Sequence, residues 1–259
     1  MSLKGRNAIV TGSTSGIGLA IAEALAQAGA NIIVNGIGSE ADNDVAIRRV
    51  AKGGTRVIFN GADMLRHNQI AAMVEKAEQE LGSVDIVVNN AGIQHVSPVE
   101  QFPIEKWDAI IGINLSSSFH TVRAAVPGMK RRKWGRIINI CSAHSLVASP
   151  FKSAYIAAKH GLAGFTKCVA LELAESGVTS NAISPGFVWT PLVEKQLPDL
   201  AKSKGISIDE AKAYVVGAQP NKRFIMPEEI GSLAAFLASD AAGSITGANY
   251  SIDGGWTAQ

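Results

Sequence analysis

The chain has few of the features that accompany membranes or nucleic acids. Its 259 residues carry 18% charged residues and a formal net charge of only +2. No apolar run approaches the roughly 20 residues that cross a bilayer, and the first residues lack the apolar stretch of a signal peptide. The small net charge provides no basic stripe for a polyanion. We therefore expect neither a membrane nor a nucleic acid as a partner.

Cysteine is also scarce. The two cysteines, Cys141 and Cys168, lie in apolar surroundings and have no metal-ligand spacing. This predicts two buried free thiols in a reducing compartment and no metal centre. A cytoplasmic protein is the simplest expectation.

Short β-rich runs alternate with longer amphipathic runs along the whole chain. The expected strands are Asn7–Thr11, Asn31–Asn35, Arg56–Asn60, Ile86–Asn89, Arg136–Cys141, Val178–Ile183 and Asn249–Ile252. Their nearly continuous apolar character is typical of strands covered on both faces. The expected helices are about Gly16–Ala28, Ala41–Lys52, Asn68–Leu81, Ile104–Arg132, Ser153–Ser176 and Pro227–Ser239. The alternation predicts an α/β fold with a parallel sheet and helices on both sides.

One region departs from this alternation. Between Thr190 and about Met226 the helical patterns are weak, polar residues are frequent, and prolines stand at Pro191, Pro198 and Pro220. A long, poorly regular insertion in a compact domain often forms a lid or a binding loop. We expect one domain over 1–259 with a substrate lid at about 190–226.

The first expected strand runs into a glycine cluster, Thr11-Gly12-Ser-Thr-Ser-Gly16-Ile-Gly18, and an apolar helix follows. Glycine lets the backbone turn sharply and approach a pyrophosphate, which then lies at the positive end of the helix. The spacing differs from the common G-x-G-x-x-G, and a glycine cluster alone is also compatible with a simple tight turn. At the first strand–helix junction of an alternating chain, dinucleotide binding is the favoured interpretation.

Asn35 ends the second expected strand, where an NAD-binding protein usually has an acidic residue beside the adenosine ribose. Asparagine does not repel a 2′-phosphate, so this position alone weakens the case for NAD. However, no Lys or Arg lies between Asn31 and Ile47, and Ser15 gives no cation inside the glycine loop. We therefore expect NAD. Asp63, after the third strand, is placed to accept from the adenine amino group or to cap the next helix.

A second motif carries the candidate chemistry. Tyr155 and Lys159 are four residues apart in an Ala-rich segment, so on a helix they lie one turn apart on the same face. A nearby ammonium stabilises a phenolate and lowers its pKa, and such a phenol can exchange a proton with an alcohol or a carbonyl. Ser142, at the end of an apolar strand, is placed to hold the same substrate oxygen. Alone, the Tyr-x-x-x-Lys pair is more often a half-buried ring with a solvated lysine.

With both motifs in place, the chain closely resembles the short-chain dehydrogenase/reductase family. The resemblance covers nearly the whole chain, through Thr11-Gly12-x-x-x-Gly16-x-Gly18, Asn89-Asn90-Ala91-Gly92, Asn114, Ser142, Tyr155-x-x-x-Lys159 and Pro185-Gly186. It implies a Rossmann-type, doubly wound sheet of about seven parallel strands and, commonly, a homotetramer.

The resemblance also implies roles for individual residues. Tyr155 is the acid/base, Lys159 lowers its pKa and binds the nicotinamide ribose, Ser142 polarises the substrate oxygen, and Asn114 holds a water for a proton relay. The implied cofactor-binding set is Gly12, Thr14, Ser15, Gly16, Ile17, Gly18, Asn35, Asp63, Asn90, Gly92, Tyr155, Lys159, Pro185, Gly186, Val188 and Thr190. Two of these asparagines have plainer alternatives, because Asn114 could satisfy backbone groups at a helix kink and Asn90 could be a turn residue.

Further stretches are similar to those of family members that oxidise a small hydroxy acid to a keto acid. They are Asn89-Asn-Ala-Gly-Ile-Gln94-His95, Ser142-Ala-His144, Lys152-Ser-Ala-Tyr155, Thr190-Pro-Leu-Val-Glu-Lys-Gln196 and Asp253-Gly-Gly-Trp256. This resemblance implies a substrate site made of Gln94, Ser142, His144, Lys152, Tyr155, Phe187 and Gln196. Within it, Gln94, His144, Lys152 and Gln196 would surround the carboxylate.

Lys152 supports an anionic substrate on separate grounds. It lies near the start of the expected catalytic helix, where the helix dipole disfavours a cation. It also precedes Tyr155 by three residues, so it lies on the side of the reacting centre. A substrate carboxylate would compensate the unfavourable position, whereas the alternative is a solvated lysine. His144 is either a ligand or a packed core histidine.

Two other functions fit parts of the sequence. A 3-oxoacyl-thioester reductase that uses NADPH would need a cation near Asn35 and an open route for a long acyl carrier, and neither is visible. A non-catalytic nucleotide-sensing protein would keep the fold, but the intact Ser142, Tyr155 and Lys159 argue against it.

Overall fold

The centre of the molecule is one sheet of seven parallel strands, seen in a computed structural model that describes residues 2–259. The strands are β1 Asn7–Val10, β2 Asn31–Asn35, β3 Val57–Asn60, β4 Ile86–Asn89, β5 Gly135–Ile140, β6 Val178–Pro185 and β7 Asn249–Ile252. They lie in the order β3-β2-β1-β4-β5-β6-β7, and every neighbouring pair is parallel. The predicted doubly wound sheet is confirmed.

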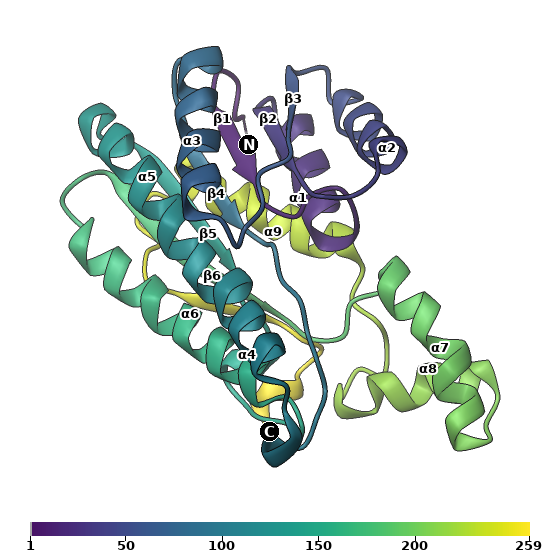
Figure 1. The fold of residues 1–259 in the computed structure, drawn as a ribbon. Coiled ribbons are helices and arrows are strands. Elements are labelled where there is room, and N and C mark those ends of the chain that lie inside the picture. The colour runs from purple at the N-terminus through teal and green to yellow at the C-terminus, as the bar shows by residue number, and fades with distance from the viewer. Residues whose placement is uncertain (1) are drawn as a thin grey trace.

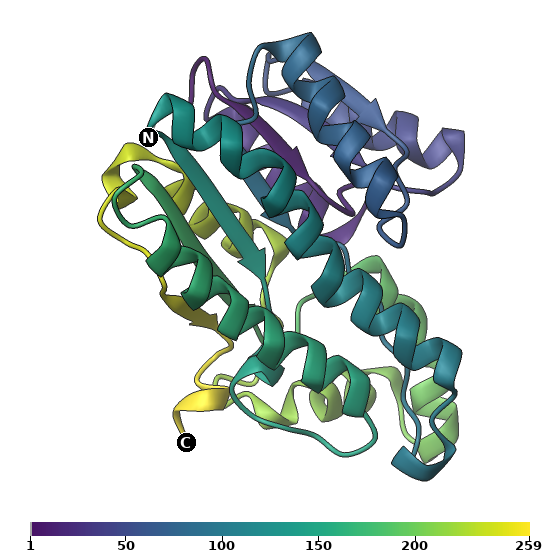
Figure 2. The same ribbon diagram turned by 60° about the vertical axis from the view of Figure 1, so that its left-hand side comes forward.

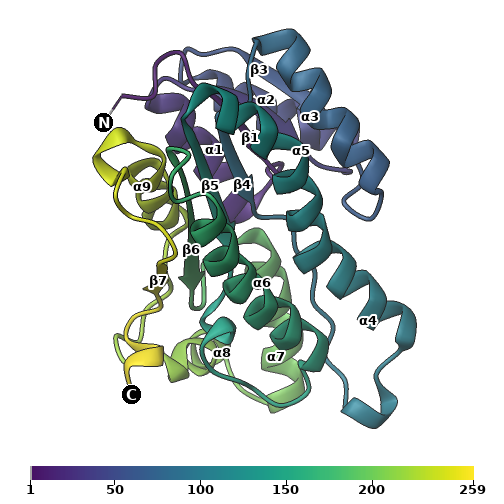
Figure 3. The same cartoon turned by 90° about the vertical axis from the view of Figure 1, so that its left-hand side faces the viewer.

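Helices cover both faces of the sheet. One layer contains α1 (Gly16–Gln27), α2 (Glu40–Ala51) and α9 (Pro227–Ala238), and the other contains α3 (His67–Leu81), α5 (Ser117–Arg132) and α6 (Ser153–Glu172). Figure 1 shows the sheet between these layers, Figure 2 shows α5 and α6 along one face, and Figure 3 shows α9 on the opposite side.

The strand sequences explain the two layers. Along β1, Ala8 and Val10 face the core under α1 and α9, while Ile9 faces the core under α3 and α5. All three are fully buried, as the alternation of side chains along a strand requires when both faces are covered. Burying a side chain such as Ile9 contributes roughly 1.5–3 kcal/mol, so a charged residue there would break the second core.

The strand order creates a crevice at one edge of the sheet. After β1 the chain moves outward to β2 and β3, and then returns to place β4 on the other side of β1. The connections after β1 and β4 therefore leave in opposite directions at the carboxyl ends of adjacent strands. Such a topological switch point is where ligands bind in open α/β sheets.

The single helix predicted over Ile104–Arg132 is interrupted in the structure. Helix α4 (Ile104–Ile111) and α5 are separated by a π-helical turn over Gly112–Ser116. The Asn114 side chain in this turn bonds to the backbone of Ile93, and that contact accompanies the extra residue in the turn. Single π-turns inside α-helices are frequent at functional sites.

The 190–226 segment is more regular than the sequence predicts. It forms α7 (Pro191–Lys204) and α8 (Ile208–Val215), which pack around their own small cluster of Leu197, Ala201 and Ala211. Figures 1 and 3 show both helices set apart from the two layers, beyond the carboxyl edge of the sheet. The start signals are present in the sequence, with Pro at the start of α7 and a Ser-x-x-Glu capping box, Ser207 with Glu210, on α8.

The two cysteines differ in burial. Cys141 is buried, as predicted, but Cys168 is exposed on α6, where its thiol donates to Glu172. The prediction was wrong for Cys168 because Val169 and Ala170 face the core, whereas Cys168 lies on the exposed face of the helix with Leu171, which is 81% exposed. In residues 2–259, no helix is long and apolar enough to cross a membrane, and no group of three or more potential ligand side chains could hold a metal.

Candidate functional site

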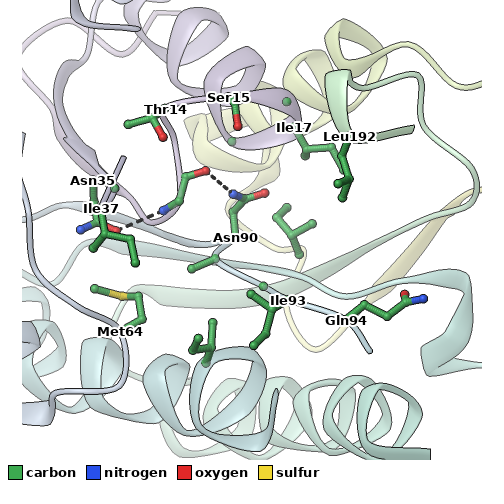
Figure 4. Close-up of a pocket in the computed structure, with 18 of the residues that line it drawn as sticks. Thr14, Ser15, Ile17, Asn35, Ile37, Met64, Asn90, Ile93, Gln94 and Leu192 are labelled. Atoms are coloured by element: carbon green, nitrogen blue, oxygen red, sulfur yellow. Dashed lines mark hydrogen bonds between the residues drawn. The ribbon is translucent and has the colours of Figure 1, made fainter. Parts of the chain in front are cut away.

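A cavity of about 530 Å³ opens at the crevice between β1 and β4. Its lining comes from the loops after β1 to β4, the π-helical turn, the end of β5, the first two turns of α6 and the start of α7 (Figure 4). Most of the residues predicted to hold the cofactor line it: Gly12, Thr14, Ser15, Gly16, Ile17, Gly18, Asn35, Asp63, Asn90, Gly92, Tyr155, Lys159 and Thr190. The lining formed by residues 2–259 does not include Pro185, Gly186 or Val188.

The glycine loop is held in place by close backbone contacts. Gly12 has φ +61°, and a Cβ there would lie 2.9 Å from the Cα of Ala91. A Cβ at Gly18 would overlap the Asn90 amide and the Gly12 carbonyl. The loop ends at the N-terminus of α1, where unpaired N–H groups and the helix dipole favour an anion. This geometry suits a pyrophosphate.

Asn90 joins the loops after β1 and β4. Its Nδ2 donates to the carbonyls of Thr11 and Gly12, at 2.9 and 3.0 Å, and Figure 4 shows the second bond. The Thr11 hydroxyl in turn accepts from the backbone N–H groups of Asn90 and Ala91. Asn90 is therefore more than a turn residue, since it fixes the two connections that bound the crevice.

Asn35 does not direct its amide into the cavity. It is 1% exposed, its Oδ1 accepts from Gly12 N at 3.1 Å, and its Nδ2 donates to the carbonyls of Asn60 and Ala62 at 3.0 and 2.9 Å. The expected contact with the adenosine ribose is replaced by an internal one, because every polar group of this side chain is already paired. Asn35 thus joins the glycine loop to the ends of β2 and β3.

The sequence analysis missed the residues that follow Asn35. Gly36, Ile37 and Gly38 line the cavity, and Ile37 is 76% exposed. A Cβ at Gly36 would lie 2.6 Å from the Thr14 side chain, so glycine gives that side chain room. Their position directly after a strand that ends at the crevice was the available signal.

Asp63 lines the cavity, so its predicted contact with the adenine amino group stays a prediction. Its alternative role as a helix cap is not found, because its Oδ1 accepts from Leu65 N at 2.9 Å, before α3 begins at His67, and the N-cap residue of α3 is Arg66. Among the lining residues of the described chain, Lys159 is the single Lys or Arg. A 2′-phosphate near Asp63 would find no cation there.

Ser142 and His144 cluster with Tyr155, which lines the cavity. The Ser142 hydroxyl accepts from His144 N at 3.1 Å and lies 3.5 Å from His144 Nδ1. His144 Nε2 bonds the Ser149 hydroxyl at 2.8 Å, and the His144 ring meets the Tyr155 ring edge-on, with centroids 6.0 Å apart. Ser142 follows β5 and is the N-cap residue of the short 3-10 turn Ala143–Ser145. This turn holds the Ser142 hydroxyl at the end of the strand, close to His144.

Lys159 is positioned differently from the sequence prediction. Its Nζ donates to the carbonyl of Ile140 at 2.7 Å and lies 5.6 Å from the Tyr155 ring centroid. Burial raises the pKa of the Tyr155 phenol, and the hydrogen bond with Ser142 is what opposes the rise. Burial also lowers the pKa of Lys159 itself. That Lys159 lowers the pKa of Tyr155 stays a prediction.

Asn114 follows the plainer of its two interpretations. It is 1% exposed, its Oδ1 accepts from Ile93 N, and its Nδ2 donates to Ile93 O, both at 2.9 Å. The side-chain amide thus fixes the loop that carries Gly92 and Ile93 into the cavity. Its role in holding a water stays a prediction.

The residues predicted for the carboxylate are only partly assembled. Lys152 occupies the N-cap position of α6, where its side chain makes no capping hydrogen bond. It is half-buried, and its charge is one cause of the lowered pKa of His144. Gln94 lines the outer cavity (Figure 4). Gln196 lies exposed on α7, with no contact to this cluster in the described residues. The pair Lys152 and His144 is therefore the assembled part of the site.

An aromatic group not predicted as a site closes the cluster. The Trp256 ring stacks on Phe187, with centroids 5.2 Å apart and an 8° interplanar angle, and meets His144 edge-on at 5.1 Å. Phe187, Trp256, His144 and Tyr155 thus form one continuous row of rings, called here the aromatic row. Phe187 was predicted to bind substrate, but the contact with Trp256 near the C-terminus was not visible in the sequence.

Comparison with known proteins agrees with this geometry. A family model described as enoyl-(acyl carrier protein) reductase matches residues 12–257. The D-beta-hydroxybutyrate dehydrogenase of Cupriavidus necator is 56% identical over 260 residues, which cover 99% of this chain and 100% of that protein. The enzyme of the same name from Rhizobium meliloti is 56% identical over 257 residues, covering 98% and 99%.

A solved structure is similar along the whole chain. The crystal structure of a putative short-chain alcohol dehydrogenase from Sinorhizobium meliloti 1021 superposes with a TM-score of 0.91 at 34% identity. It covers 100% of this chain and 98% of that one. The sheet, the crevice and the outlying helices are thus shared at the level of the fold.

Asn35→Asp tests the internal role of Asn35. Aspartate can still accept from Gly12 N, but the carbonyls of Asn60 and Ala62 lose their donor and face a buried carboxylate. We expect the free energy of unfolding to fall by about 2–4 kcal/mol, measured by urea titration. The exposed Asn68→Asp is the matched control. An equally stable Asn35→Asp protein would contradict this role.

The pH dependence of stability tests the burial of His144. Burial, together with Lys152, lowers the pKa of His144 from its ordinary 6.5 to about 4. Between these values the unfolded chain binds a proton that the folded chain excludes, so stability is lost as pH falls through this window. We expect the free energy of unfolding, measured with urea, to fall less in His144→Gln than in the wild type when the pH is lowered from 7 to 4. This span of roughly 3 pH units brackets the shift. Parallel losses would contradict a neutral buried ring.

Proposed function

Since the chain belongs to the short-chain dehydrogenase/reductase family, we propose that it is an NAD-dependent 3-hydroxybutyrate dehydrogenase. It oxidises (R)-3-hydroxybutyrate to acetoacetate, reversibly. The observation that carries the proposal is the 56% identity, over nearly the whole chain, to two D-beta-hydroxybutyrate dehydrogenases. Within the site, Lys152 lies at the start of the helix that carries the proposed acid/base Tyr155, and the His144 ring contacts the Tyr155 ring. A small anion fits this end of the site.

NAD is the proposed cofactor. The glycine loop at the N-terminus of α1 suits its pyrophosphate, and Lys159 is the single Lys or Arg in the described lining, which leaves a 2′-phosphate unpaired. Asn35 takes no part in the choice, because its side chain is paired internally. Discrimination then depends on Ile37 and the small residues beside it, over which the adenosine ribose would lie.

In the proposed reaction the substrate alcohol loses a hydride to the cofactor and a proton to Tyr155. The nicotinamide, when bound, accepts the hydride from C3 of the substrate. Tyr155 takes the hydroxyl proton, and the Ser142 hydroxyl holds the oxygen as its bond to carbon becomes a double bond. Lys159, whose Nζ lies 5.6 Å from the Tyr155 ring centroid, would bind the ribose. The C–H and O–H bonds of the substrate break as its C=O bond forms. The two electrons leave with the hydride, so NAD is the only oxidant that the reaction requires.

Substrate recognition involves both edges of the cavity. Lys152 pairs with the carboxylate, neutral His144 donates a hydrogen bond, and Gln94 lies at the outer rim. Phe187 contacts the methyl group. We propose that the 190–226 segment is a lid, whose movement brings Gln196 on α7 to the carboxylate. A homotetramer in the cytoplasm is the proposed working form, in keeping with the family.

The decisive experiment compares an acid with its uncharged analogues. Wild-type protein with NAD should form NADH from (R)-3-hydroxybutyrate, with a kcat/KM roughly a hundredfold or more above that for its methyl ester or 2-butanol. Lys152→Ala should lose most of this preference through KM, by roughly thirtyfold, because it removes binding that is present in both ground and transition states. The readout is NADH absorbance over a series of substrate concentrations.

The matched control is Lys167→Ala, an exposed lysine on the same helix. It should keep the preference for the acid. If the wild type oxidises 2-butanol as well as the acid, the proposed substrate is wrong. If Lys152→Ala keeps the wild-type KM, the lysine does not bind the carboxylate.

A further inference from the structure

The two ends of the 190–226 segment meet in a short parallel bridge. Ile225 N donates to Phe187 O, and Trp189 N donates to Ile225 O, both at 2.9 Å. The residues that enter the segment and those that leave it are thereby held side by side. Phe187 lies at this junction and also at the outer end of the aromatic row.

Gln219 lies buried inside the junction, with an exposed fraction of 0%. Its Oε1 accepts from Phe187 N, and its Nε2 donates to Arg223 O at 2.6 Å. The backbone is paired as well, since Gln219 N donates to Val216 O and Lys222 N donates to Gln219 O. Burying an amide costs free energy unless it is hydrogen-bonded. Here the amide oxygen bonds the segment that enters 190–226, at Phe187, and the amide nitrogen bonds the segment that leaves it, at Arg223.

Gly186 leaves space for this amide. A Cβ at Gly186 would overlap Gln219 Oε1 and would lie 3.0 Å from the Cα of Asp253. Asp253 is 5% exposed and accepts from the backbone of Gly255 and Thr257, so it shapes the turn that carries Trp256. Gly186 therefore lies where the backbone of Phe187 and the C-terminal turn approach the same buried glutamine.

Gln219 fixes the backbone of Phe187, and the Phe187 ring supports the rest of the row. Phe187 stacks on Trp256, Trp256 meets His144, and His144 meets Tyr155. Gln219 touches none of the cavity-lining residues that hold the cofactor. Its one hydrogen bond to the aromatic row, in the described residues, is the bond that it accepts from Phe187 N.

We propose that Gln219 is a positioning residue for substrate specificity. By holding Phe187 against Trp256, it sets the position of His144 beside Lys152 and leaves the cofactor half of the cavity unaffected. The inference rests on the proposed function, because it assigns Gln219 to binding of the hydroxy acid.

The first test is Gln219→Met, which keeps the length of the side chain but removes both amide hydrogen bonds. We expect KM for 3-hydroxybutyrate to rise by about tenfold or more, while the Kd for NAD changes by less than about twofold. Gln219→Glu keeps the acceptor for Phe187 N, and its buried carboxyl, when protonated, can still donate to Arg223 O, so it should raise KM less. The exposed Gln79→Met is the control for the substitution itself. Equal losses of NAD affinity and substrate affinity would overturn the proposal, because a merely structural role predicts them.

The second test couples Gln219 to Phe187. Phe187→Leu keeps the backbone N–H and removes the stacked ring, and it should reproduce the rise in KM. If both residues act through the Phe187 ring, KM of the double variant is no higher than that of the more affected single variant. If they act independently, the two fold-increases in KM multiply. Multiplied effects would contradict the proposal. If Gln219→Met does not fold, Gln219→Glu takes its place in the cycle.

A readout without substrate separates this inference from the proposed function. Near-ultraviolet circular dichroism of the Phe187–Trp256 stack should weaken in Gln219→Met and Phe187→Leu and stay unchanged in Gln79→Met. A wild type that is inactive with 3-hydroxybutyrate refutes the proposed function, and the dichroism still tests the positioning. An unchanged spectrum in folded Gln219→Met refutes the positioning.

Discussion

The close approach of two backbone segments at Gly12 is the constraint on which the rest of the site depends. A Cβ at this position would meet the Cα of Ala91, and the carbonyl of Gly12 accepts from Asn90. On the other side, Gly12 N donates to Asn35. The loop after β1 is thus bonded to the end of β2 and to the loop after β4, across the point where the strand order reverses. Its fixed shape leaves the N-terminus of α1 facing the cavity.

The reacting groups depend on the same edge of the sheet. β5 delivers Ser142, α6 delivers Tyr155 and Lys159, and the π-turn holds the β4 loop through Asn114. These groups come from three different elements, yet all lie at the carboxyl edge of the sheet. A distant part of the chain completes the cluster, because Trp256 packs between Phe187 and His144. The cofactor half is held by hydrogen bonds, whereas the substrate half is held largely by aromatic packing and by Gln219.

Much of the fold could be predicted from the sequence because its strands are apolar on both faces. All seven strands and the main helices are found within one or two residues at most ends. The larger differences are local: helix α6 ends at Glu172, four residues early, and β6 extends to Pro185. The glycine loop and the placing of Tyr155 and Lys159 one turn apart on one helix were also predictable, since both follow from short sequence spacing, whereas the bond of Lys159 to the distant Ile140 carbonyl was not. What could not be predicted depends on contacts between distant residues. The side-chain direction of Asn35 is set by the carbonyls of Asn60 and Ala62, and the π-turn by the backbone of Ile93.

The direct measurement of the central claim follows the hydride. (R)-3-hydroxybutyrate labelled with deuterium at C3 is incubated with NAD and the wild-type protein, and the NADH is analysed by mass spectrometry. The account predicts NADH that carries one deuterium, with acetoacetate as the other product. Unlabelled NADH, or no NADH at all, would contradict it.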